Sequence, residues 1–226
     1  MTPAPLFLLT LILSFCSIVY ELLLAQSMSA TLGNSFLRYN VTIGLYLASL
    51  GAGAILCSKR GEDDLLPLLI DVELALTLLG ALSPLLILFF DTAAFKSAGG
   101  SRLYTALVYG FDHALIVAIG LLSGYELPLL MRLGKDLSNE VLAVDYLGTL
   151  LGALCFPLLL LPSLGVLSAA ALTALLNALC ALYLLLFLKQ DLRRLALCGL
   201  GAALCLALIG ARGLVESAAT AWYLQR

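Results

Sequence analysis

The sequence predicts an all-α fold, a polytopic integral membrane helical bundle of about seven transmembrane helices that forms a single domain over residues 1–226. Hydrophobic residues make up 62% of the chain and charged residues only 12%, whereas a soluble domain is roughly 45–50% apolar and about 25% charged. The mean hydropathy of +1.09 agrees with lipid as the main solvent. Continuous leucine and alanine runs, without apolar–polar alternation, exclude a membrane β-barrel. The net charge of −2 and the scattered basic residues argue against binding to nucleic acid.

A bilayer core of about 30 Å requires roughly 20 apolar residues of helix, and seven stretches meet or approach that length. They are residues 6–30, 36–57, 66–90, 103–132, 141–161, 164–188 and 194–211. The first is too long for the apolar region of a signal peptide and has no basic residue before it, so we interpret it as a membrane span. The fourth contains a weak point at Gly120, Gly124 and Pro128. Pro162 and Gly165 leave a turn of a few residues between spans five and six, which predicts a tight antiparallel hairpin.

The distribution of lysine and arginine predicts the orientation, because these residues are enriched on the cytoplasmic side of a membrane. The side that holds the N-terminus and the loops after spans two, four and six has seven of them: Lys59, Arg60, Arg132, Lys135, Lys189, Arg193 and Arg194. The other side has five: Arg38, Lys96, Arg102, Arg212 and Arg226. The count favours a cytoplasmic N-terminus and an external C-terminus.

Acidic residues inside the apolar stretches are the main functional candidates, because a carboxylate at the bilayer centre costs about 2.5–3.5 kcal/mol on insertion scales. Six residues qualify to different degrees: Glu21, Asp71, Glu73, Asp112, Glu126 and Asp145. Asp71 and Glu73 follow an acidic loop, residues 62–64, and we expect both to remain near water.

The outer half of the predicted bundle holds one cluster of polar residues. Glu21 shares a helical face with Ser14, Ser17 and Met28, and that face should point into the bundle. At similar depth the sequence places further candidates for ligand binding: Arg38, as a partner for Glu21, together with Asn40, Asp112 and His113. Such a cluster would transfer protons or hold a cationic ligand. The alternative is a buried salt-bridge network that fixes the helix register.

The inner half holds a second pair of ligand-binding candidates, Glu126 and Asp145. Glu126 lies two residues before Pro128, which frees a backbone carbonyl, and Asp145 lies near the start of span five. Arg132 is a candidate to neutralise either one. Carboxylates beside broken helices form ion and amine sites in transporters. The alternative is that both acids only cap helices at the membrane surface.

Small residues predict close helix packing. Gly44, Gly51 and Gly53 in span two, and Gly148 and Gly152 in span five, let backbones approach, within the chain first and in a dimer second.

Residues that could hold a metal or cofactor form no motif. The six cysteines include no C-x-x-C pair. All except Cys57 lie inside apolar runs and are interpreted as small buried hydrophobes: Cys16, Cys155, Cys180, Cys198 and Cys205. With a single histidine, the sequence argues against a metal site. There is no phosphate-binding glycine loop, so we expect no cofactor.

Several segments together resemble a known family. They are residues 20–26 (YELLLAQ), 32–35 (LGNS), 44–53 (GLYLASLGAG), 124–130 (GYELPLL), 144–153 (VDYLGTLLGA) and 161–165 (LPSLG). They are similar to the membrane region of bacterial membrane-bound spermidine synthase-like proteins, in which several spans are fused to an aminopropyltransferase domain. The resemblance implies a bacterial inner-membrane location, with Glu21, Glu126 and Asp145 as matching polar positions. The chain stops near where the catalytic domain would begin, so no catalytic residue is carried over.

Three functional hypotheses remain open at this stage, and they leave open whether the chain is an enzyme. The first is a polytopic module that binds or passes a small cation, an amine or a proton, as in transport, or couples to a partner protein. The second is an intramembrane enzyme for a lipid or lipid-linked substrate, with Glu21, Asp112 and His113 as catalytic acid–base candidates. The third is a non-catalytic assembly subunit. The expected partners are the lipid bilayer and a membrane protein or a second copy of the chain, with no nucleic acid.

Overall fold

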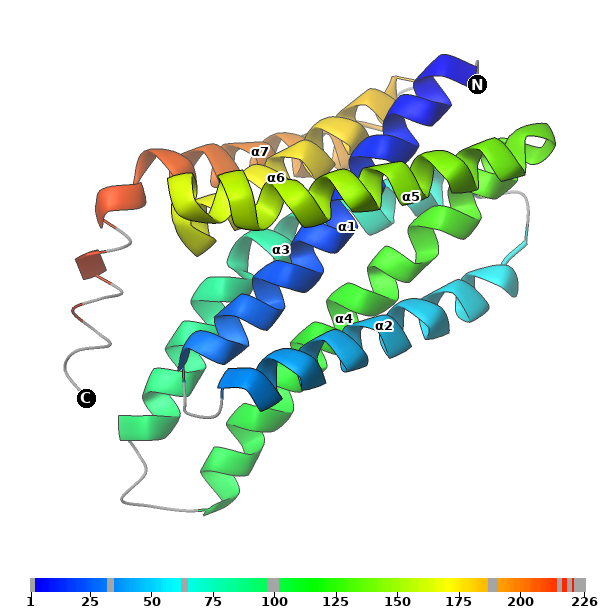
Figure 1. Ribbon diagram of the computed structural model, residues 1–226. Coiled ribbons are helices and arrows are strands. Elements are labelled where there is room, and N and C mark those ends of the chain that lie inside the picture. Colours follow the sequence, from blue (N-terminus) through cyan, green and yellow to red (C-terminus); the bar gives the residue numbers. More distant parts are fainter. Residues whose placement is uncertain are drawn as a thin grey trace.

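The computed structural model describes residues 3–31, 35–61, 65–96, 102–186 and 191–214, and positions 217, 218 and 221. It contains seven α-helices: α1 (Pro3–Thr31), α2 (Ser35–Ser58), α3 (Leu65–Lys96), α4 (Arg102–Leu133), α5 (Ser138–Cys155), α6 (Leu161–Leu185) and α7 (Leu192–Gly210). A 3₁₀ turn, Lys135–Leu137, precedes α5, and a π-helical turn, Phe156–Leu160, joins α5 to α6. Over these ranges there is no β-strand, and the all-α prediction is confirmed (Figure 1).

Six helical stretches in the described part are long and apolar enough to cross a membrane. Seven spans were predicted, and the difference lies in spans five and six, which form one stretch of 51 residues, Lys135–Leu185. At a rise of about 1.5 Å per residue, a straight helix of this length would exceed the bilayer core more than twofold. The end of the predicted sixth span, residues 187–188, and positions 32–34 lie outside the described residues.

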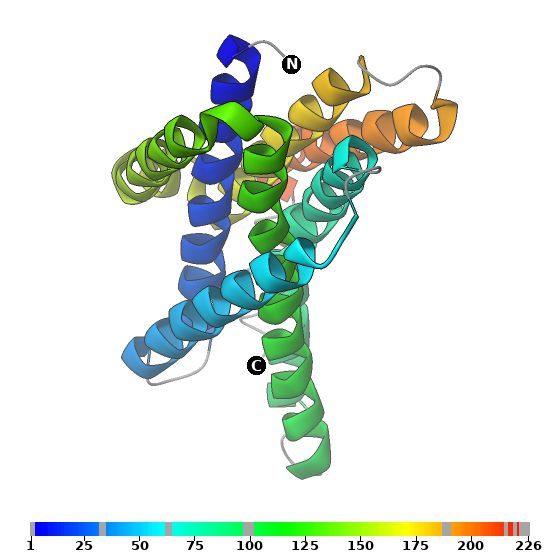
Figure 2. The same ribbon diagram turned by 90° about the vertical axis from the view of Figure 1, so that its right-hand side faces the viewer.

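The chain reverses at Gly165, which has φ 72° and ψ 176°. Only glycine adopts this conformation without strain, since it has no Cβ. In Figure 1 the chain runs along α5, turns, and returns along α6. The short turn was predicted, but the prediction that the two helices form a tight antiparallel hairpin was wrong. α5 packs on α1, whereas α6 packs on α3, α7 and α1, so the two helices lie on either side of α1 (Figure 2).

Helix α1 forms the centre of the bundle and contacts α2, α3, α4, α5 and α6. Because neighbours surround it, its polar face is buried as the spacing predicted: Ser14, Ser17, Glu21 and Met28 are all below 10% exposed. The described cysteines are all free thiols, and all are buried except Cys155, which is half-buried. For the five in apolar runs, this agrees with their interpretation as small hydrophobes.

Close contacts between α2 and α4 depend on glycine. A Cβ at Gly124 would lie 3.0 Å from Cα of Gly53, and Gly120 is equally crowded by Ser49 and Tyr46 of α2. Helix α4 continues without interruption through Pro128, so the expected weak point is instead a packing surface.

Glycine also brings α5 against α1, where Gly148 and Gly152 leave no room for a Cβ beside Leu11 and Phe15. The predicted packing within the chain is confirmed for these two glycines and for Gly53. It is wrong for Gly44 and Gly51, which have nothing within 4 Å of a Cβ position.

Candidate functional site

A cavity of about 210 Å³ lies between α1, α2, α4 and α5. Its polar walls come from residues three or four positions apart, which share one face of each helix. The lining residues are Ser14 and Ser17 of α1, Leu50 and Ala54 of α2, Ser123, Gly124, Glu126, Leu127, Pro128 and Met131 of α4, and Asp145 and Thr149 of α5.

Two carboxyl groups line this cavity. Glu126 is 4% exposed, and its Oε1 has no hydrogen-bond partner within the described part of the chain. Asp145 is half-buried on the facing helix, α5. The structure therefore brings the two predicted inner residues to one site.

Arg132, the expected neutralising partner, does not join them. Its guanidinium donates to the carbonyls of Cys57, Arg60 and Gly61, at 3.4, 3.0 and 2.9 Å, at the end of α2. Cys57 lies in the last turn of α2, and Arg60 and Gly61 follow the helix. Carbonyls at a helix C-terminus lack intrahelical donors, and a cation there stabilises the helix end. Arg132 is a C-terminal cap, and the assignment as counter-ion was wrong.

A hydroxyl network includes two residues of the cavity lining, Ser17 and Ser123. The Tyr46 hydroxyl lies 3.0 Å from the Ser17 carbonyl oxygen, 3.0 Å from Ser123 Oγ and 3.3 Å from Ser17 Oγ. Tyr46 is fully buried, and it joins α1, α2 and α4 at one point. Tyr46 was not a candidate from the sequence, although it lies in the segment 44–53 that carries the family resemblance.

The prediction that Glu73 remains near water was wrong. It is 0% exposed, and within the described structure neither of its carboxyl oxygens has a hydrogen-bond partner of ordinary geometry. Its carboxyl group is an electrostatic neighbour of that of Glu126 across the α3–α4 interface, and it is not among the residues that line the cavity. Two residues along a helix correspond to about 200° of rotation, so Glu73 points inward where Asp71 points outward.

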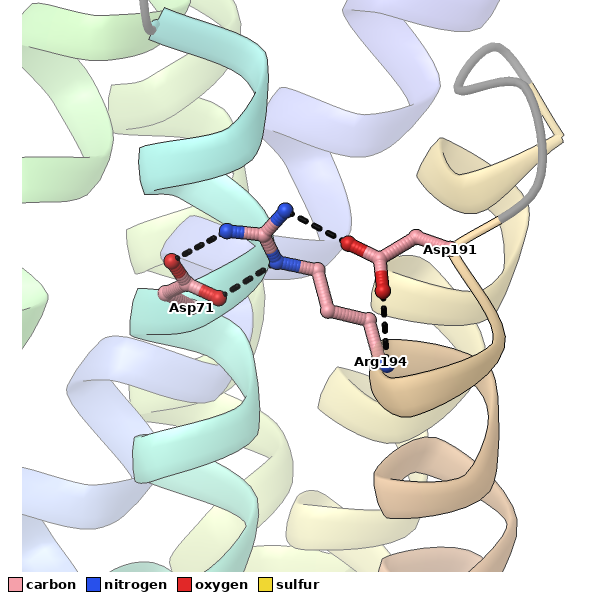
Figure 3. A network of polar contacts seen from close by, with 3 residues as sticks. All are labelled: Asp71, Asp191 and Arg194. Carbon is pink, nitrogen blue, oxygen red and sulfur yellow. Dashed lines mark hydrogen bonds and ion pairs between the residues drawn. The ribbon is translucent and has the colours of Figure 1, made fainter.

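Asp71 does remain near water, as predicted, with its side chain 51% exposed. Both of its carboxylate oxygens accept hydrogen bonds of 2.7 Å from Arg194 of α7 (Figure 3). Arg194 also contacts Asp191, which caps α7 by accepting the Arg194 backbone N–H at 3.1 Å. These hydrogen bonds from Arg194 hold the pKa of Asp191 below its ordinary value. The network fastens α7 to α3 at the surface.

A second carboxyl pair lies toward the other end of the α3–α4 contact. Asp91 and Asp112 are both 0% exposed and interact with each other. Arg38 of α2 pairs with Asp91 at 3.4 Å and lies 5.0 Å above the Tyr109 ring. Asp112 and Glu126 are 14 residues apart on α4, about 21 Å along the helix, so the two carboxyl pairs are separate sites.

Of the other outer candidates, Arg38 lies beside Asp112 and Asp91. It was expected to pair with Glu21 but pairs with Asp91, a residue that was not a candidate from the sequence. His113 is half-buried, and its Nδ1 lies 2.7 Å from the carbonyl of Tyr109 on its own helix. Asn40 is exposed, and its amide donates to the Phe36 carbonyl.

Glu21 is buried on α1, one turn beyond Ser17. In the part of the chain that the structure describes, no hydrogen bond or ion pair joins Glu21, Asp112 and His113.

Curated proteins similar to this chain agree with the resemblance seen in its motifs. It is 35% identical over 168 residues to a polyamine aminopropyltransferase of Leptospira interrogans. It is 36% identical over 173 residues to polyamine aminopropyltransferase 2 of Ralstonia nicotianae, and 36% over 170 residues to the polyamine aminopropyltransferase of Mycobacterium tuberculosis. These matches cover 70–72% of this chain.

The chain is homologous to the membrane region of spermidine synthase-like proteins. It spans about a third of the length of the curated relatives, since each match covers 31% of the relative. No family model and no solved structure matches the chain.

Proposed function

We propose that this membrane module binds a small organic ammonium ion in the cavity between α1, α2, α4 and α5, with Glu126 and Asp145 as its charge partners. The observation that carries the proposal is the contrast between the two buried carboxyl pairs. Asp91 and Asp112 have Arg38 beside them. Glu73 and Glu126 have no basic side chain beside them in the described structure, but they adjoin a cavity.

The chemistry of the lining favours a small amine. Carboxylates supply the opposite charge, and the hydroxyls of Ser17, Ser123 and Thr149 accept N–H donors. The volume of about 210 Å³ is below the roughly 300–1,000 Å³ typical of sites for drug-sized ligands. The relatives are named polyamine aminopropyltransferases, which makes aliphatic polyamines the first class to test.

The direct test is calorimetric binding of putrescine and spermidine to the protein in lipid nanodiscs. Truncating one partner of a buried charge pair costs about 2–5 kcal/mol, so we expect Glu126→Gln and Asp145→Asn to weaken binding by at least about tenfold. Glu140→Gln is the matched control, because this carboxylate is exposed on the first turn of α5. Absence of saturable binding, or equal affinity in Glu126→Gln, contradicts the proposal.

We also propose that the module lies in a bacterial inner membrane with its N-terminus in the cytoplasm. The basic-residue count supports this orientation, as does the placement of Arg132 and Arg60 together at the α2 end. Reporter fusions at each terminus test it, and an external N-terminal reporter would reverse the assignment.

A further inference from the structure

We infer that Glu73 and Glu126 share one proton when the cavity is empty, and that an ammonium ion entering the cavity displaces this proton. The inference rests on the proposed function, because it describes how that same site responds to its ligand. The pair lies at the α3–α4 interface, where Glu126 lines the cavity and Glu73 does not.

Burial of the pair requires a proton. Glu73 is 0% exposed and Glu126 is 4% exposed, and two like charges side by side in an apolar interior cannot both persist. Three of their four carboxyl oxygens have no hydrogen-bond partner of ordinary geometry among the described residues. One proton held between the carboxyls supplies a donor and removes one charge.

The titratable groups around the pair add no positive charge. They are Cys16 and Tyr20 of α1, Tyr46 of α2, Asp145 of α5 and Cys180 of α6. In the part of the chain that the structure describes, no lysine, arginine or histidine faces the pair. A cation that balances the second carboxylate must therefore come through the cavity.

The proton that leaves offsets part of the charge that putrescine brings. The pair with one proton carries one negative charge, and the Asp145 carboxylate brings the site to two. When one ammonium group of putrescine donates to the Glu126 carboxylate, the shared proton leaves to bulk solvent or buffer, and only the bond between the proton and a carboxyl oxygen breaks. Three carboxylates and the two ammonium groups then carry one negative charge. Proton release therefore limits the change in the charge of the site to one unit, where binding without release would change it by two.

Calorimetry in buffers of different ionisation enthalpy measures the displaced proton. For putrescine binding near neutral pH, we expect the wild-type protein to release about one proton, with affinity rising up to about tenfold per pH unit. In Glu73→Gln the amide donates to Glu126 and keeps it ionised, so we expect binding with no proton release and no such pH dependence. Asp71→Asn, on the same helix but at the surface, should behave as wild type.

Infrared spectroscopy tests the shared proton without any ligand. We expect a protonated-carboxyl band at neutral pH in the amine-free protein, part of which disappears in Glu73→Gln and on addition of putrescine. If an amine binds but no proton is released, or if an amine binds and the band is unchanged in Glu73→Gln, the inference is overturned and the proposed function stands. If no amine binds and the band is also unaffected by Glu73→Gln, both are overturned. If no amine binds but Glu73→Gln removes part of the band, the shared proton stands and its displacement by an amine is overturned.

Discussion

Replacing Gly124 by alanine should force α2 and α4 apart. A Cβ at this position would lie 2.9 Å from the carbonyl carbon of Leu50 and 3.0 Å from Cα of Gly53, and closer still to the Leu50 carbonyl oxygen. All three neighbours are backbone atoms, which no change of side-chain rotamer relieves. Carbon atoms pack best about 3.5–4.0 Å apart, so the helices must separate by about 0.5–1 Å.

The magnitude follows from two opposing effects. Overpacking of this kind costs typically about 1–3 kcal/mol, and alanine regains up to about 1 kcal/mol of helix propensity relative to glycine. We expect Gly124→Ala to lower the free energy of unfolding by about 1–2 kcal/mol. Gly44 of α2 and Gly110 of α4 have nothing within 4 Å of a Cβ position, so alanine there should be neutral or slightly stabilising.

Thermal unfolding in one detergent, followed by circular dichroism, compares the three variants. A Gly53→Ala variant extends the test, because its Cβ would lie 3.0 Å from the Leu121 carbonyl carbon in the same interface. Once one alanine has separated the helices, the second should lower the free energy of unfolding by less. The loss of stability in the double variant should therefore be smaller than the sum of the losses in the two single variants. If Gly124→Ala is as stable as Gly44→Ala, the close backbone contact does not hold α2 to α4.

Three further outcomes are expected at other positions. Removing the cap on α2 with Arg132→Ala should lower stability by about 1 kcal/mol, measured by thermal unfolding against the exposed control Arg193→Ala. Gly165→Ala should cost about 1–3 kcal/mol because of its backbone conformation, and equal melting temperatures for variant and wild type would contradict this. The depressed pKa of Asp191 means that its hydrogen bonds to Arg194 are present above the unfolded-state pKa and are lost as pH falls through the folded-state value. Stability should therefore fall as pH decreases from about 5 through the unfolded-state pKa of about 3.9 and below it. A fall of the same size in Asp191→Asn would show that other groups cause it.

The helical pattern predicted the elements well because apolar length alone decides where a membrane helix forms. The shared face of Ser14, Ser17 and Glu21 was likewise predictable, since helix geometry fixes it within one element. The meeting of Glu126 with Asp145 at one cavity agrees with the prediction that both lie in the same half of the bundle.

Residues whose role depends on helix rotation and neighbours were not predictable in this way. Glu73 and Asp71 are two positions apart in one acidic region, and only the direction in which α3 faces α4 separates a buried carboxyl from an exposed one. Arg38 and Arg132 have long side chains that reach several candidate partners. Arg38 pairs with Asp91, and Arg132 binds carbonyls at the end of α2. Sequence position gives the depth of such groups but not their partners.

The buried pair of Glu73 and Glu126 is difficult to explain as a contribution to the stability of the protein. A buried ionic or polar pair is often replaced by apolar residues at no cost, or with a gain of about 1–4 kcal/mol, and leucines would fill the α3–α4 interface without any desolvation penalty. A purely structural pair would also be expected to have its own counter-charge, as Asp91 has in Arg38. Glu73 and Glu126 instead lie where a cavity reaches one of the two carboxyls. An acid that is buried, lacks a fixed cation and adjoins a cavity can exchange a proton for another cation, whereas a sealed acid cannot.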